Sequence, residues 1–248
     1  MKKILCIVLP ISLVFTVTMG LAGCRSGVDS SVKETTENQI LQSQSQSPSP
    51  SPSSASLPEP SESTSDIIIA GQRIPLDTTS ITGLLDGKDI TDISALSSLT
   101  NLKVLQVQYN SVSDIGPLSG LVNLEELYLH RNSISDIGAL SGLSNLKILH
   151  MGDNLITDIS ALSGLTDLEE LLIRNNSISD ISPLGSLTNL RELNLESNPI
   201  TDISPLSGLT NLEKLFLGGN QDSSSPLLSR QQLDELQNSL PNCFIGYY

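Results

Sequence analysis

The sequence predicts an α/β-type solenoid: a stack of equal coils with a parallel β-sheet on its concave face and mostly 3₁₀ turns on its convex face. The first observation is a strict period of 22 residues, and the second is a short alternating apolar stretch in each period. A constant period predicts one structural unit stacked on its own copies, with recognition on an open surface rather than in an enclosed pocket. An asparagine column marks the period: Asn110, Asn132, Asn154, Asn176, Asn198 and Asn220.

Residues 1–23 have the pattern of a signal peptide, so they are set apart from the fold. Lys2 and Lys3 precede an apolar run, which is short for a membrane-spanning helix. Leu21-Ala22-Gly23-Cys24 resembles a bacterial lipobox. That resemblance implies that Cys24 carries diacylglycerol and holds the protein on the cell membrane, facing outside the cytoplasm. An ordinary secretory peptide or an uncleaved membrane helix are the alternatives.

Residues 24–65 comprise Cys24 and a tether rich in serine, glutamine and proline, including the run Ser47–Pro52. This composition offers almost no apolar surface to bury, so we expect a disordered spacer. Phosphorylation or glycosylation of the tether is an open alternative.

Within each period the apolar positions recur in the same slots. In the coil of Asn132, the stretch Leu127–His130 alternates with period two, which indicates a strand buried on one face. Gly138–Leu143 is too short for an α-helix and predicts a 3₁₀ turn. Proline near the start of this turn in other coils suits a helical first turn. The apolar slots of this coil are Leu124, Leu127, Leu129, Ile134, Ile137, Leu140 and Leu143.

The two polar columns have structural explanations. We expect each asparagine to turn inward and bond backbone groups of its own and the adjacent coil, which forms a structural ladder. Each aspartate from Asp92 to Asp202 precedes a turn, and its side chain can accept hydrogen bonds from the N–H groups of that turn. A calcium role for the aspartates is a weaker alternative, because the repeats lack glycine-rich ligand loops.

The pattern Leu-x-x-Leu-x-x-Leu-x-Leu-x-x-Asn-x-Ile-x-Asp-Ile, as in Leu121–Ile137, resembles the leucine-rich repeat of internalin-like bacterial proteins. The resemblance covers residues 85–220 and implies a leucine-rich-repeat solenoid that binds protein, with no particular receptor. It also implies a β-hairpin lid in residues 66–84 and a cap in residues 221–248, with an amphipathic helix over Gln231–Leu240. Cys243 then becomes a small buried residue.

Exposed slots near the end of each strand vary from coil to coil and supply the candidate binding residues. Aromatic and arginine side chains are enriched in interface hot spots. The simpler explanation is that exposed strand positions favour aromatic residues for their β-propensity. A zinc site at His130 and His150 is a further, poorer alternative, because two ligands do not make a site. The predicted partner-binding residues are Tyr109, Tyr128, His130, Arg131, His150, Arg174 and Phe216.

Charge and motif content narrow the function. The formal net charge of −14 disfavours nucleic acid as a partner. No catalytic motif is recognisable, and we expect neither an enzyme, a cofactor nor a metal. The predicted function is a membrane-anchored binding protein with a monomeric ectodomain that recognises a protein or peptide. A structural or accessory envelope protein and a carbohydrate-binding surface protein are the alternatives.

Overall fold

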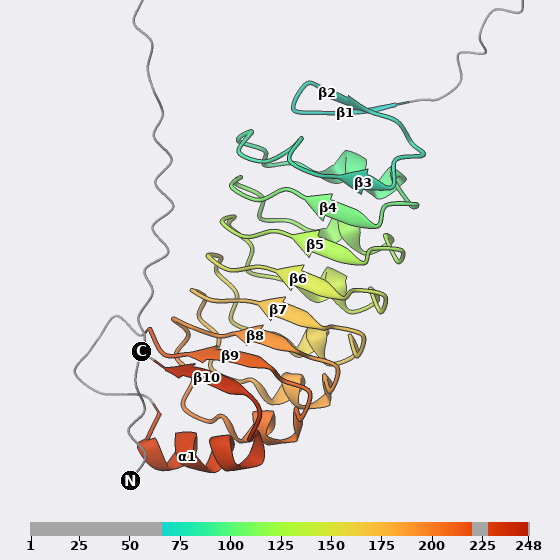
Figure 1. The fold of residues 1–248 in the computed structure, drawn as a ribbon. Helices are drawn as coiled ribbons and strands as arrows, with labels where there is room; N and C mark the ends of the chain where they lie inside the picture. Colours follow the sequence, from blue (N-terminus) through green and yellow to red (C-terminus); the bar gives the residue numbers. More distant parts are fainter. Residues whose placement is uncertain (1–65, 220–227, 248) are drawn as a thin grey trace, which may run out of the picture. The chain divides into compact units, whose positions relative to one another are not determined.

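The computed structural model describes residues 66–219 and 228–247, which lie in one compact unit (Figure 1). It begins with an antiparallel hairpin of β1 (Ile67–Ile69) and β2 (Gln72–Ile74), joined through Ala70 and Gly71. Both linking residues have positive φ, as a tight hairpin requires. Ile69 and Ile74 are buried against the first coil, so the predicted lid is confirmed.

The remaining strands of the described residues form one eight-stranded parallel sheet, in the order β10-β9-β8-β7-β6-β5-β4-β3. Consecutive coils therefore place their strands side by side, as the stack in Figure 1 shows. From β4 to β9 each residue pairs with the residue 22 positions later, such as Leu127 with Leu149. The strands are β3 (Ser80–Ile81), β4 (Val104–Gln106), β5 (Glu126–Tyr128), β6 (Ile148–His150), β7 (Glu170–Leu172), β8 (Glu192–Asn194), β9 (Lys214–Leu217) and β10 (Phe244–Tyr247).

The opposite side of each coil is a single 3₁₀ turn, as predicted. Proline occupies the first or second position of three of these turns, where φ is already helical and no N–H donor is needed. The turns are η1 (Ser94–Ser98), η2 (Gly116–Leu118), η3 (Gly138–Leu140), η4 (Ser160–Leu162), η5 (Ser182–Ser186) and η6 (Ser204–Gly208).

The core is a continuous column of leucine and isoleucine between the sheet and the turns. In the coil of Asn132 all seven predicted apolar residues are at most 2% exposed. Because each coil is only a few residues wide, these side chains are covered mainly by the equivalent residues of the next coils. Stacking therefore supplies the burial that one coil cannot.

The C-terminal end of the stack is closed by α1 (Arg230–Ser239), with Leu236 and Leu240 buried. Ser229 and Gln232 form a capping box at the start of this helix. The predicted helical cap is thus confirmed, and β10, which was not predicted, follows it as an edge strand. Cys243 is buried, which raises the pKa of its thiol.

Several predictions lie outside the described residues: the signal peptide, Cys24, the tether and Asn220. Within residues 66–219 and 228–247, no helix has the length and apolar content needed to cross a membrane.

Candidate functional site

The variable slots lie on the solvent side of the sheet, where each strand ends. Tyr128 and His150 are the last residues of β5 and β6, and they are paired across the two strands. One residue after Tyr128 the chain still runs beside its neighbour, since the Leu129 N–H donates to the His150 carbonyl at 2.7 Å. The slot directly before each asparagine then turns away in a left-handed conformation, with φ of 58° at Tyr109 and 56° at Arg131. Alternation alone did not predict that turn.

A hollow of about 330 Å³ opens at the centre of this surface, across the coils of β4 to β8. Gly152 is buried and forms part of its floor, because a glycine stands where neighbouring coils carry longer side chains. Aromatic, histidine and arginine side chains stand around it. The hollow is lined by Tyr109, His130, Arg131, His150, Gly152, Asp153, Leu172, Arg174 and Asn194.

The aromatic side chains on one side of the hollow are arranged in edge-to-face pairs with the histidines. The rings of Tyr109 and His130 are 5.0 Å apart at 80°, and those of Tyr128 and His150 are 4.8 Å apart at 85°. The Arg131 guanidinium lies 5.3 Å from the Tyr109 ring centroid, in cation–π range. These contacts hold the side chains in place before any partner binds, so less conformational entropy is lost on binding.

Hydrogen bonds to glutamates fix two of these groups. Nε2 of His150 lies 2.6 Å from Oε1 of Glu170, and the Tyr128 hydroxyl donates to Oε2 of Glu126 at 2.9 Å. Burial, with that hydrogen bond as the next contribution, raises the pKa of Tyr128 to about 12. Burial also lowers the pKa of His130, so its imidazole is neutral at neutral pH.

Two arginines share one aspartate at the other side of the hollow. Oδ2 of Asp153 lies 3.7 Å from Nε of Arg131 and 3.5 Å from Nη2 of Arg174. Oδ1 of Asp153 accepts a hydrogen bond of 2.6 Å from the Asn175 amide. The arrangement leaves the hollow with one more positive than negative side chain among its lining residues.

The structure brings together six of the seven predicted partner-binding residues and separates the seventh. Phe216 lies two strands beyond Leu172 and packs against Phe244 of β10, with ring centroids 6.0 Å apart. Phe216 therefore belongs with the C-terminal cap. Sequence reasoning missed four lining residues, because none belongs to a type enriched in hot spots: Gly152, Asp153, Leu172 and Asn194.

The asparagine column lies behind this surface and holds adjacent coils together. Oδ1 of Asn132 accepts from the Val112 N–H of the preceding coil, while its Nδ2 donates to the carbonyls of Leu129 and Val107. The described asparagines from Asn110 to Asn198 repeat this arrangement.

Each aspartate of the second column accepts the backbone N–H two residues later, as Asp136 does from Gly138 at 2.8 Å. Both columns therefore serve the backbone. In the part of the chain that the structure describes, no three histidine, cysteine or carboxylate side chains are grouped as metal ligands.

Comparison with known proteins agrees with this geometry. A family model for leucine-rich repeats, described as two copies, matches residues 122–164, 166–208 and 188–242. The fold is a leucine-rich-repeat solenoid. Internalin C2 of Listeria monocytogenes is 43% identical, with a TM-score of 0.51 over 52% of this chain and 57% of that one. Another internalin of the same species, inlF, is 32% identical, with a TM-score of 0.63 over 72% of this chain and 51% of that one.

The leucine-rich repeats are thus similar to those of internalins, and the chain spans 57% and 51% of the length of these two solved internalin chains. No curated protein matched the chain in the sequence comparison.

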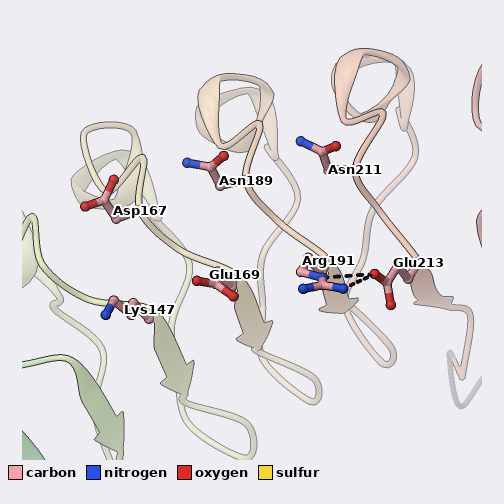
Figure 2. A pocket seen from close by; sticks show the side chains of 7 residues that line it. All are labelled: Lys147, Asp167, Glu169, Asn189, Arg191, Asn211 and Glu213. Carbon is pink, nitrogen blue, oxygen red and sulfur yellow. Dashed lines mark hydrogen bonds and ion pairs between the residues drawn. The ribbon is translucent and has the colours of Figure 1, made fainter.

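A larger groove, of about 610 Å³, lies along the edge of the repeats where the strands begin. Figure 2 shows Lys147, Glu169, Arg191 and Glu213 in one row along the strand starts, with a second row of polar residues behind them. The first row alternates in sign from coil to coil, and Arg191 pairs with Glu213. We call this surface the edge groove.

The second row of the edge groove belongs to a further polar column, which holds Asp167, Asn189 and Asn211 and was not predicted from the sequence. Asn189 donates to the Thr166 carbonyl and Asn211 to the Thr188 carbonyl, each one coil back. Exposed ion pairs contribute little individually, and this lining has no apolar floor to desolvate a partner. The residues of the edge groove therefore serve to hold adjacent coils in register rather than to bind a ligand, although this groove is larger than the hollow.

Proposed function

We propose that this protein is a membrane-anchored extracytoplasmic binding protein, which recognises a protein or peptide partner on the concave face of its leucine-rich repeats. The observation that carries the proposal is the hollow, where a buried glycine floor is surrounded by Tyr109, His130 and two arginines. Tyrosine and arginine around a pocket that can be desolvated are typical of interface hot spots. The two solved internalins that resemble the chain add to this support at the level of the fold.

The anchor part of the proposal rests on the sequence from Lys2 to Cys24, which lies outside the described residues. Cys24 would carry diacylglycerol, whose two chains suffice for stable membrane attachment. The tether of residues 25–65 would allow a monomeric ectodomain to reach on the order of 35 Å from the lipid.

Binding is preferred to carbohydrate recognition or catalysis for geometric reasons. Sugar rings stack on open aromatic faces, whereas the Tyr109 ring already has Arg131 over it and forms a T-shaped pair with His130. A catalytic site must exclude water during reaction, and this hollow is open to solvent on a sheet face. A structural or accessory envelope role makes no use of the hollow, so variants at the hollow separate it from the proposal.

The test is crosslinking of the full-length protein on living cells, followed by identification of the captured molecule. The proposal predicts that alanine at the five central residues lowers capture about tenfold or more, as expected when hot-spot contacts are lost. These residues are Tyr128, His130, Arg131, His150 and Arg174. Alanine at Lys147 and Glu169 in the edge groove is the control and leaves capture unchanged.

Two outcomes would contradict the proposal. Undiminished capture by the five-alanine variant, with its melting temperature retained, would exclude the hollow as the binding site. Intact mass measurement of the same membrane preparation tests the anchor, since the chain should begin at a modified Cys24. An unmodified chain released into the medium would refute the lipid attachment while leaving the binding result intact.

A further inference from the structure

Gly152 is the residue that makes the hollow, and its backbone does not require glycine. Its φ is not among the positive values of the described chain, unlike that of Gly218 in the last equivalent slot. The other equivalent slots hold Gln108, His130, Arg174 and Glu196. A Cβ on Gly152 would lie 3.1 Å from Cγ of Arg174 and 3.3 Å from the Arg174 carbonyl oxygen. Glycine therefore lets the Arg174 side chain and backbone lie close against this slot, where a longer side chain would have to displace the Arg174 stem.

The charges around this space are unequal. Arg131 and Arg174 both face the single carboxylate of Asp153, and their side chains are 57% and 53% exposed, compared with 23% for Asp153. Each guanidinium has five N–H donors, whereas one carboxylate has about four acceptor positions. One acceptor position of Asp153 is already taken by Asn175. The two arginines thus retain donors that face solvent.

Two glutamates lie just outside the hollow and bond to residues that line it. Glu170 is bonded to His150, and Glu196 accepts a hydrogen bond from the Asn194 amide at 3.0 Å. Neither glutamate lines the hollow. Among the residues that line the hollow, two arginines therefore face one aspartate, on a chain whose formal net charge is −14. Their exposed guanidinium groups favour an anionic group over a cationic one at this place.

Resting on the proposed function, we propose that the partner is an acidic peptide segment whose aspartate or glutamate side chain enters over Gly152 and pairs with Arg131 and Arg174. The carboxylate accepts hydrogen bonds from the guanidinium N–H groups that do not bond to Asp153. Planar guanidinium groups suit such pairing. Leu172 and the buried floor accept the methylene stem of the same side chain.

The experiment selects peptides from a random library displayed on phage, using the purified full-length protein as target. Each selected peptide is then tested against Gly152→Gln, which fills the hollow with the side chain that Gln108 places in the equivalent slot. Gly164→Ala is the matched glycine control, because a Cβ there has no other atom within 4 Å. We expect peptides that lose binding to Gly152→Gln but keep binding to Gly164→Ala, and that contain an aspartate or glutamate.

The charge pairing is tested by amide replacement on both sides. Changing the peptide's acid to its amide, or Arg174→Gln in the protein, should each weaken binding about tenfold or more. Both changes together should lower the affinity little more than either change alone, because the two groups are partners in one contact. The melting temperatures of Gly152→Gln and Arg174→Gln establish that both variants are folded.

The remaining results separate this inference from the proposed function. Peptides that depend on the hollow yet bind equally well with the acid amidated would overturn the acidic partner and leave the binding function standing. Tighter binding of a phosphoserine peptide than of its glutamate counterpart would also overturn the choice of a carboxylate. If Gly152→Gln leaves every selected peptide bound, the hollow is not a recognition site and both proposals fail.

Discussion

Asp86 and Asp92 belong to the same coil, yet their carboxylates lie in opposite electrostatic surroundings. Burial raises the pKa of Asp86, against a smaller lowering by a backbone hydrogen bond with Gln108. The backbone N–H of Ser94 lowers the pKa of Asp92. Oδ2 of Asp86 accepts from the Gln108 amide at 2.8 Å, but within the described residues neither Oδ1 of Asp86 nor Oε1 of Gln108 has a partner. An amide in place of Asp86 could satisfy both.

Asp86→Asn is therefore expected to raise the free energy of unfolding by about 1 kcal/mol at pH 7, the value of one added hydrogen bond. Because the folded pKa of Asp86 lies above its unfolded value, its carboxyl favours the fold at low pH and loses that contribution as pH rises. The gain from Asn should thus vanish below about pH 4, where the parent carboxyl is protonated as well. Urea denaturation across this range measures it.

Asp92→Asn is the opposite-sign control for this prediction. The folded pKa of Asp92 is lowered, so its carboxylate stabilises the fold above its unfolded pKa, and this contribution is lost as pH falls through the folded pKa. Asp92→Asn should consequently destabilise at pH 7. The same sign of change in both variants would refute the assignment of their environments.

At the scale of one coil, the asparagine ladder joins the turn after a strand to the coil before it. Asn154 is 7% exposed and its Oδ1 accepts from the Ile134 N–H at 3.0 Å. Its Nδ2 donates to the Leu129 and Met151 carbonyls, each at 3.1 Å. One side chain therefore satisfies backbone groups of two coils, in a region where water cannot replace it.

Asn154→Ala should lower the free energy of unfolding by about 2–4 kcal/mol, because it leaves a buried N–H and two carbonyls without their partner. Asp158→Ala, four positions later, removes one exposed hydrogen bond to the Ser160 N–H and should cost less than half as much. Chemical denaturation of both variants makes the comparison. Equal losses would mean that the ladder adds nothing beyond ordinary turn capping.

The elements differ in how far sequence could predict them. Repetition identified the 3₁₀ turns and the core, because each slot is seen several times in one chain. β3 and β10 occur once each, at the ends, and β3 has only two residues, Ser80 and Ile81, which give no alternation to detect. The left-handed slot at Tyr109 and Arg131 was missed because residue types there vary while the backbone does not.

The candidate site was predictable only in part, for a related reason. Tyr128, His130 and His150 were found from residue type and column, and their pairing follows from strand register. The hollow depends on a side chain that is absent at Gly152, and pattern analysis weights the residues that are present. Phe216 was grouped with them by its column, although distance along the stack places it beside Phe244.

Across the whole molecule, the solenoid separates stability from recognition. Each coil contacts chiefly its two neighbours, so stability is close to a sum of similar terms along the stack. The hollow instead occupies one place, across the coils of β4 to β8, where Gly152 stands between His130 and Arg174 in its column. Removing one period anywhere should therefore cost a similar amount of stability, but its effect on binding should depend on position.

Two excisions of 22 residues test this separation. Deleting residues 133–154 joins Asn132 to Leu155 and deleting residues 177–198 joins Asn176 to Pro199, so each keeps the repeat in register. Both chains should fold cooperatively, with melting temperatures lowered by similar amounts. The first deletion removes His150, Gly152 and Asp153, whereas the second removes only Asn194 from the lining of the hollow, so the first alone should abolish peptide binding. Equal loss of binding would show that recognition depends on the curvature of the whole stack rather than on the hollow.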